Sequence, residues 1–203
     1  MPPPAYLLIA GISWPFVRFG YRLRWRGIEN LPRSGGFVLA ANHTSNFDPW
    51  PLGIPLFPRR ILRFMAKSEL YWFPLRLVLD AGGAFPVRRG QGDTEAITTA
   101  VRLCREGEIV VMFPEGTRRT KGLRKKRVAR PRTGAARIAL EAGVPLVPAA
   151  IRGTDRLARL GRLRVAYGAP LPIDEIRSLE PREAAEQATE LLMAEIERLE
   201  ASL

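Results

Sequence analysis

Two hydrophobic patterns alternate along this chain of 203 residues. Short apolar or strictly alternating runs predict strands, and they occupy residues 21–26, 37–41, 61–66, 108–113, 144–151 and 163–167. Segments with apolar residues three and four positions apart or with helix start signals predict helices, at residues 49–57, 69–79, 94–105, 133–142 and 183–199. Because strands and helices alternate, the chain is predicted to form one α/β domain with a mixed, largely parallel sheet flanked by helices.

Two of the predicted helices have a distinct apolar face. In residues 94–105 this face contains Ile97, Val101 and Cys104, and Gly107 is the expected stop. In residues 183–199 the face consists of Ala184, Ala188, Leu191, Leu192, Ile196 and Leu199. Both faces are expected to pack against the core.

Residues 1–20 form an apolar segment that precedes the domain expected at residues 21–203. The apolar run is shorter than the roughly 20 residues of a spanning helix, and the absence of a basic region before it argues against a signal peptide. Two interpretations are open. The segment lies in a membrane interface, with Trp14, Phe16 and Phe19 inserted and four arginines at positions 18 to 26 near the headgroups, or it is a helix packed on the domain.

The charge balance is strongly basic. There are 32 Lys and Arg residues against 20 Asp and Glu, which gives a formal net charge of +12. Such a surface attracts phosphates of nucleic acids, anionic lipids or phosphorylated small molecules. The single cysteine, Cys104, allows no internal disulfide, and with a single histidine a structural zinc site is not expected. We expect no metal and no bound cofactor.

The single histidine, His43, follows the strand predicted at residues 37–41 and precedes a turn that ends in Asp48 and Pro49. Five residues is not a same-face helical spacing, but a turn allows the carboxylate to fold back onto the imidazole. That geometry suits a general base held in one tautomer by a carboxylate. The alternative is that Asp48 is only a helix N-cap and His43 an ordinary turn residue.

Three loops contain side chains that can bind or react with a substrate, at residues 43–48, 85–89 and 115–119. In parallel sheets, ligands bind beyond the carboxyl ends of the strands. If all three loops lie on one rim, a base, a carboxylate and several guanidinium groups converge there. Such a rim suits a phosphorylated substrate whose hydroxyl is to be deprotonated.

Four patches, in this order, resemble the motifs of the glycerolipid acyltransferases, in particular the 1-acyl-glycerol-3-phosphate acyltransferases (lysophosphatidic acid acyltransferases). They are N-H-x4-D at residues 42–48, G-A-F-P-V-R at 83–88, F-P-E-G-T-R at 113–118 and V-P-L-V-P at 144–148. The patches span about residues 40 to 150, and the third matches the family letter for letter. The resemblance implies a glycerolipid-acyltransferase-like single domain with an apolar N-terminal segment at the membrane interface.

The resemblance also implies roles for individual residues. His43 would be the general base, and Asp48 would fix its tautomer and stabilise the imidazolium. Arg88 and Arg118 would bind the phosphate of the acceptor. Lys67 resembles the family at its position and is a weaker phosphate candidate, since most lysines are simply exposed.

The third motif adds further candidates for substrate binding. Thr117 and the amides around Gly116 would donate hydrogen bonds to an oxyanion or a phosphate. Glu115 would bind a hydroxyl or orient the neighbouring Arg118. One departure stands out: Arg132 occupies a position where relatives often carry lysine, which keeps the charge and changes the hydrogen-bond geometry.

The function that the resemblance implies is O-acyl transfer. A fatty acyl group would pass from acyl-CoA or acyl carrier protein to the sn-2 hydroxyl of 1-acyl-glycerol 3-phosphate, giving phosphatidic acid. The expected partners are the lysophospholipid acceptor, the acyl donor and an anionic membrane surface. The expected location is peripheral, at the cytoplasmic face of the inner membrane.

Two alternatives stay open. An acyltransferase with another acceptor, such as glycerol 3-phosphate, a lyso-ornithine lipid or a glycolipid, would share the His-Asp motif. A nucleic-acid-binding module would explain the basic run at residues 118–132, which contains no acid. No aromatic residues are interleaved with that run and no recognisable binding motif is present, so nucleic acid is not an expected partner. The simplest interpretation of the run is a solvated or mobile loop beside the active site.

Overall fold

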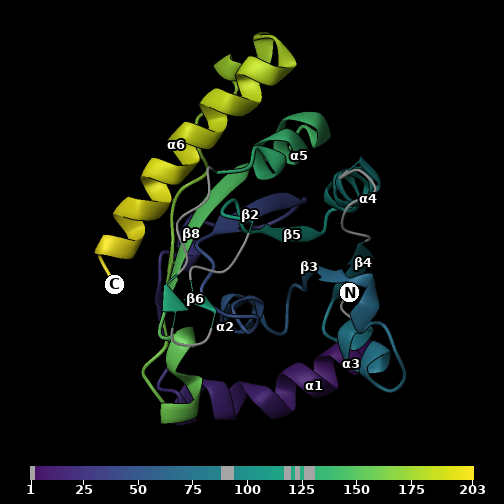
Figure 1. The fold of residues 1–203 in the computed structure, drawn as a ribbon, viewed down its shortest axis with the longest axis vertical. Helices are drawn as coiled ribbons and strands as arrows, with labels where there is room; N and C mark the ends of the chain where they lie inside the picture. The colour runs from purple at the N-terminus through teal and green to yellow at the C-terminus, as the bar shows by residue number, and fades with distance from the viewer. Residues whose placement is uncertain (1–2, 88–93, 117–119, 122–123, 126–130) are drawn as a thin grey trace.

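The computed structural model describes residues 3–87, 94–116, 120–121, 124–125 and 131–203 (Figure 1). Within them, a seven-stranded sheet has the order β1-β9-β8-β2-β5-β3-β4. Its strands are β1 (Arg24–Arg26), β2 (Phe37–Ala41), β3 (Leu62–Lys67), β4 (Ala84–Val87), β5 (Ile109–Met112), β8 (Leu146–Arg152) and β9 (Arg164–Tyr167).

Neighbouring strands of this sheet are parallel, except for the antiparallel pair β8 and β9. The predicted mixed, largely parallel sheet is therefore confirmed. Because β8, β2, β5, β3 and β4 run in one direction, their carboxyl ends lie along one edge. The loops that follow these strands are thereby brought to the same side of the molecule.

Helices cover both faces of the sheet (Figure 1). The α-helices are α1 (Pro4–Pro15), α2 (Pro49–Gly53), α3 (Leu75–Ala81), α4 (Thr94–Arg105), α5 (Gly134–Ala142) and α6 (Pro181–Ala201). A π-helical turn follows α1 at Phe16–Gly20, and short 3-10 turns lie at Ile28–Asn30, Ile54–Leu56, Ser68–Leu70, Thr154–Arg159 and Glu175–Ser178. Helices α4, α5 and α6 pack on one face, and the segments around α1 and α2 pack on the other.

Strand β2 shows why both faces must be covered. Val38 and Ala40 point to the side of α4, α5 and α6, whereas Phe37, Leu39 and Ala41 point to the opposite side, as the two-residue period of a strand requires. All five side chains are fully buried. This central strand is therefore a continuous apolar run, as is typical of a parallel sheet with helices on both faces.

Strand β1 is shorter than the predicted strand at 21–26. Arg22 has a φ of 50°, in the left-handed region, so the chain bends there and pairs with β9 only from Arg24 onward. Leu23 is nevertheless fully buried. The alternation of side chains was thus a correct indication of burial and an incorrect indication of strand length.

Helix α6 confirms the closing helix and corrects one residue of its predicted apolar face. Leu191 is 44% exposed, whereas the other five residues of that face are buried. The face follows a repeat of four through Ala184, Ala188, Leu192 and Ile196, and Leu191 lies one position to the side of it.

The basic run at 118–132 falls mostly outside the described residues. Two short pieces of its backbone, β6 (Thr120–Lys121) and β7 (Arg124–Lys125), pair antiparallel as a ribbon. No strand is predicted there from the hydrophobic pattern.

Helix α1 packs on the domain along one side, and the rest of α1 and the π-helical turn after it are exposed, so the membrane contact stays a prediction. Tyr6 and Ala10 are buried against Ile61 of the domain, whereas Ile12 and Phe16 are 70% and 58% exposed. Trp14, expected to insert in a membrane, is instead half-buried and packed on the core of the domain. Among the helices of the described chain, none is long and apolar enough to span a bilayer.

Candidate active site

The centre of the candidate site is the pair His43 and Asp48, in the turn between β2 and α2. Asp48 Oδ2 lies 2.8 Å from His43 Nδ1. The Asp48 side chain is fully buried, and that of His43 is 17% exposed. The carboxylate makes no capping hydrogen bond to α2, so the interpretation of Asp48 as only an N-cap is wrong. As predicted, the carboxylate folds back across five residues to the imidazole.

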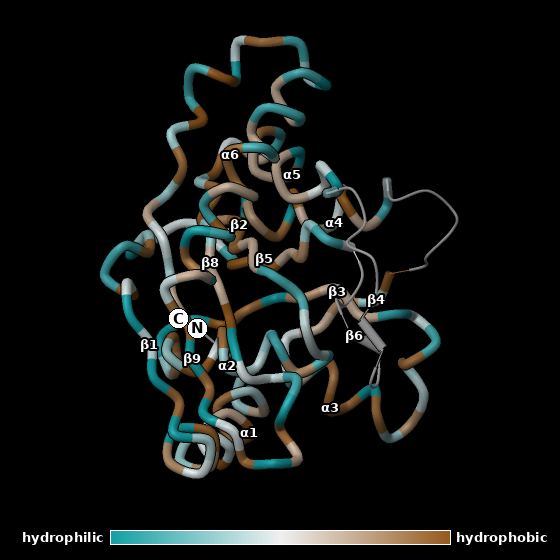
Figure 2. Tube along the Cα trace, turned by 60° about the vertical axis from the view of Figure 1, so that its left-hand side comes forward, coloured by the Kyte–Doolittle hydropathy of each residue, from teal (hydrophilic) through white to brown (hydrophobic). Residues whose placement is uncertain are grey.

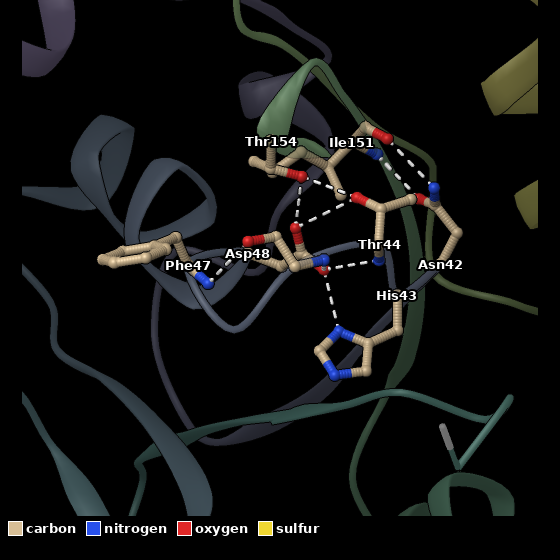
Figure 3. Close-up of polar contacts among 8 residues, drawn as sticks. Asn42, His43, Thr44, Phe47, Asp48, Ile151 and Thr154 are labelled. Atoms are coloured by element: carbon tan, nitrogen blue, oxygen red, sulfur yellow. Dashed lines mark hydrogen bonds and ion pairs between the residues drawn. The ribbon is translucent and has the colours of Figure 1, made fainter. Parts of the chain in front are cut away.

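Hydrogen-bond donors surround the Asp48 carboxylate (Figure 3). Its Oδ2 accepts from the backbone N–H of Thr44 at 2.8 Å and of Ser45 at 2.9 Å. Its Oδ1 accepts from the Thr154 hydroxyl at 2.5 Å, and the Thr44 and Thr154 hydroxyls lie 2.6 Å apart. The carboxylate is thus held in place from the turn itself and from the segment that follows β8.

These contacts determine which imidazole nitrogen carries the proton. An ionised carboxylate only accepts hydrogen bonds, so His43 Nδ1 must donate its N–H to Asp48. The other nitrogen, Nε2, then has a free lone pair and points away from the carboxylate (Figure 3). An imidazole held in this tautomer is suited to accept a proton at Nε2.

Asn42 fixes the start of the turn. Its buried side chain donates from Nδ2 to the Ile151 carbonyl at 2.9 Å and accepts at Oδ1 from the Ile151 N–H at 2.8 Å. The amide thereby replaces a rung of the ladder between β2 and β8 at the point where β2 ends. Together with Thr154, it joins both ends of the His43 turn to β8 and to the segment that follows β8.

The third motif follows β5, the neighbour of β2. The Phe113 ring stacks on the His43 ring, with centroids 4.1 Å apart and planes 19° from parallel. Glu115 is buried, and the Gly116 N–H donates to the Phe113 carbonyl at 2.9 Å, which closes a tight turn. The third motif is thus in direct contact with the His43 turn.

Gly116 suits the backbone of this turn and lies against the Arg132 side chain. Its φ is 66°, a left-handed conformation that glycine adopts without cost. In addition, a Cβ there would lie 2.6 Å from Nε of Arg132, so the Arg132 side chain covers this turn. The arginine that departs from the family pattern therefore lies at the candidate site.

Four predicted site residues remain, and the structure describes one of them, which lies at the edge formed by the carboxyl ends of the parallel strands. Lys67 is exposed at the end of β3, which is separated from β2 by β5. Arg88, Thr117 and Arg118 fall outside the described residues. Of the predicted rim, the structure describes the His43–Asp48 turn, the Glu115–Gly116 turn and residues 85–87. The last of these belong to strand β4, so the prediction of a loop there is wrong.

Three contributors were not identified from the sequence. Asn42 and Phe113 belong to the motifs without a predicted role, and Thr154 belongs to none of the four motifs. A signal existed for Thr154, because it follows the apolar strand predicted at 144–151, and that strand also ends at the ligand-binding edge.

An apolar pocket of about 190 Å³ adjoins the His43 turn. Asn46, Phe47 and Pro49 line it on the side of the turn. The rest of its wall comes from α1, α2, β3 and α3 and consists of Tyr6, Ile9, Ala10, Trp50, Gly53, Ile54, Leu62, Phe64, Val78, Leu79 and Gly82. An apolar pocket beside a polar centre is suited to a ligand with a hydrocarbon part.

Cys104 is not placed for nucleophilic chemistry. It is buried on the core face of α4, as predicted, and burial raises the pKa of its thiol to about 12. In the described part of the chain, no group of three or more His, Cys, Asp or Glu residues is placed to hold a metal ion.

The model of the Acyltransferase family matches residues 22–152. The chain belongs to the acyltransferase family. This membership confirms the resemblance inferred from the four motifs, and the protein is an O-acyltransferase. The match contains the His43 turn, the Glu115–Gly116 turn and β8 up to Arg152.

Individual relatives agree with this assignment. The chain is 36% identical over 181 residues to the 1-acyl-sn-glycerol-3-phosphate acyltransferase of Bacillus subtilis, which covers 86% of each protein. It is 31% identical over 159 residues to the chloroplastic acyltransferase BAT2 of Brassica napus, covering 76% of this chain and 43% of that protein. The chain therefore spans less than half the length of this plant relative.

The fold is also that of a solved acyltransferase. The crystal structure of the 1-acyl-sn-glycerophosphate (LPA) acyltransferase PlsC from Thermotoga maritima matches with a TM-score of 0.68. The sequence identity is 24%, and the match covers 96% of this chain and 80% of that one. The likeness confirms the predicted fold class.

Proposed function

We propose that this acyltransferase transfers a fatty acyl group to the sn-2 hydroxyl of 1-acyl-glycerol 3-phosphate and so forms phosphatidic acid. The observation that carries the proposal is the His43–Asp48 pair, whose geometry leaves Nε2 of a neutral imidazole free as a base. The names of the relatives support this acceptor. The acyl donor is acyl-CoA or acyl carrier protein, since a basic surface suits the phosphates of one and the acidic surface of the other.

In the proposed mechanism, His43 Nε2 removes the proton from the acceptor hydroxyl as its oxygen attacks the thioester carbonyl carbon. Asp48 stabilises the resulting imidazolium through Nδ1. The tetrahedral intermediate then collapses, the C–S bond breaks, and the imidazolium returns the proton to the departing thiolate. The acyl group is transferred directly, and the protein needs no covalent nucleophile of its own.

In this proposal the third motif binds the negative charges of the oxyanion and of the acceptor phosphate. Thr117 and the amides around Gly116 stabilise the oxyanion. Glu115 binds a hydroxyl or orients Arg118, and Arg118 and Arg88 hold the phosphate of the acceptor. Lys67, exposed at the same edge, contributes positive charge to it.

The apolar pocket is the proposed place for an acyl chain. It begins at Asn46 and Phe47 in the catalytic turn and extends between α1 and α3. A hydrocarbon chain of a substrate at His43 would therefore leave the polar site and enter apolar surroundings, which is favourable because apolar area is removed from water.

Helix α1 is the proposed membrane contact, at the cytoplasmic face of the inner membrane. The exposed face of α1 and of the π-helical turn after it carries four large apolar side chains, Leu8, Ile12, Phe16 and Phe19. Deletion of residues 1–20 would also uncover the pocket, because Tyr6 and Ala10 line it. Serine at the four exposed positions is the sharper test. The variant is expected in the soluble fraction, and unchanged membrane partition would refute this part of the proposal.

An acceptor assay tests the proposed reaction. Purified protein is incubated with labelled acyl-CoA or acyl carrier protein and a panel of acceptors: lysophosphatidic acid, glycerol 3-phosphate, a lyso-ornithine lipid and a lysoglycolipid. We expect phosphatidic acid as the main product. Preference for an acceptor without phosphate would contradict the roles of Arg88 and Arg118. The family membership favours an enzyme over the nucleic-acid-binding alternative.

A further inference from the structure

The segment from Leu70 to Val78 is a second apolar surface, distinct from α1. Trp72 is 57% exposed, Phe73 80% and Leu77 59%, and the two residues at the ends of the segment are also exposed. Single exposed apolar residues are common, but several large ones in nine consecutive positions are not. Such a patch indicates a surface that is covered in the working state of the protein.

This patch lies close to α1. Helices α1 and α3 contact each other, and both lie at the same end of the molecule in Figures 1 and 2. The apolar pocket lies between them and reaches the surface at two partly exposed residues of its lining, Phe47 and Val78. The patch and α1 therefore border the apolar route that leads to the His43 turn.

We propose that residues 70–78 form a second membrane-contacting surface, which lies on the bilayer together with α1 and positions the pocket at the lipid. The inference rests on the proposed function, since it assumes an acceptor held in a bilayer. The occupant is a lipid surface because the patch borders an apolar pocket beside a phosphate-suited edge. Tryptophan, as at Trp72, is enriched at membrane interfaces, and Phe73 supplies apolar area that can insert. The exposed Lys67 lies just before the patch, where an anionic headgroup would attract it.

Two separated membrane contacts restrict the orientation of the domain more than a single helix does. A single helix on a bilayer leaves the domain free to rotate about the helix axis. A second contact on the other side of the pocket fixes that rotation and keeps the pocket facing the lipid. The combined attachment is also stronger than either apolar surface alone.

The test replaces Trp72, Phe73 and Leu77 with serine in the full chain. None of the three lines the pocket or contacts His43 in the described structure. The matched control is Leu191→Ser, which removes an exposed apolar side chain from α6, on the far side of the sheet from α1 (Figure 1). Each protein is sedimented with phosphatidylglycerol vesicles, and turnover is measured with an acceptor embedded in vesicles and with a short-chain, monomeric one.

We expect the triple variant to bind vesicles at least about tenfold more weakly and to acylate the embedded acceptor about tenfold more slowly. Its rate with the monomeric acceptor and its melting temperature stay at the wild-type level, and the control variant is unchanged in all assays. Unchanged vesicle binding would overturn the proposal. An equal loss with both acceptors would also overturn it, because the patch would then serve the fold or the chemistry.

Two further outcomes are distinguishable. A dimeric wild type that becomes monomeric in the variant, with unchanged vesicle binding, would assign the patch to a second copy of the chain and overturn the proposal. If the wild type acylates neither acceptor, the proposed function fails, and vesicle binding still decides the role of the patch by itself.

Discussion

The Thr154 hydroxyl lies 2.5 Å from Asp48 Oδ1, and this contact joins the segment after β8 to the turn after β2. Both residues are buried. Thr154, in the segment that follows β8, therefore holds one oxygen of the carboxylate, while the other oxygen faces His43. The orientation of the histidine depends in this way on a residue 111 positions further along the chain.

Thr154→Val is expected to lower turnover without abolishing it. Valine has nearly the same shape but leaves Asp48 Oδ1 with one donor fewer, which costs about 1–3 kcal/mol when the group is buried. If that cost is added to the activation free energy of acyl transfer, kcat falls by about tenfold or more. Steady-state kinetics over a range of pH measures the effect.

Thr154→Ser is the matched control, because it keeps the hydroxyl and removes only a methyl group. It should restore most of the wild-type rate. A valine variant with a wild-type rate and pH profile would show that the contact has no part in positioning Asp48.

Gly116→Ala is expected to impair both stability and activity. The left-handed backbone costs an alanine about 1–2 kcal/mol, and the added Cβ would displace Arg132 from above the turn. Gly35→Ala is the control, since it has a φ of 73° but no atom within 4 Å of the added Cβ. Urea unfolding should show a similar backbone cost in both variants, whereas kcat/KM should fall only in Gly116→Ala. Equal kcat/KM values would contradict a role for this turn at the site.

Asn42→Asp is expected to destabilise the protein strongly. One carboxylate oxygen would still accept from the Ile151 N–H, but the other would face the Ile151 carbonyl, where the amide now donates. An unsatisfied buried charge costs about 3 kcal/mol or more. Asn46→Asp makes the same change at an exposed position and should be nearly neutral. Equal unfolding free energies for the two variants would contradict the structural role of Asn42.

Cys104 should resist thiol reagents in the folded protein. Burial raises its pKa to about 12, so at pH 8 the reactive thiolate is nearly absent. Because the pKa is raised, the thiol stays protonated as the pH increases through the range in which an exposed cysteine would lose its proton. Reactivity should therefore appear only on unfolding. A native-state titration with a chromogenic disulfide reagent measures this, and Cys104→Ala should retain full turnover. Rapid labelling of the folded protein would contradict the burial.

Much of the fold follows from local pattern. The strand at 37–41 and the helix at 94–105 have the predicted bounds, because both are set by residues within the segment. The exceptions depend on distant contacts or on single backbone angles. Arg22 ends the alternation at 21–26 through its left-handed φ, and Leu191 is excluded from the core by the packing of α6 on its neighbours.

In the candidate site, too, features set by neighbouring residues were predictable and features set by distant contacts were not. The fold-back of Asp48 onto His43 was predictable, because a turn brings residues five apart together. Thr154 was not predicted, because its contact depends on which strand lies beside β2. Strand order is a property of the assembled sheet, and no short stretch of sequence encodes it.

The central claim is that His43 acts as the general base, and His43→Ala tests it most directly. Turnover of the purified variant is measured with acyl-CoA or acyl carrier protein and lysophosphatidic acid, and circular dichroism and thermal unfolding verify the fold. We expect kcat to fall by about 10²–10⁴-fold while the secondary structure is retained. A folded variant with a rate near that of the wild type would contradict the mechanism.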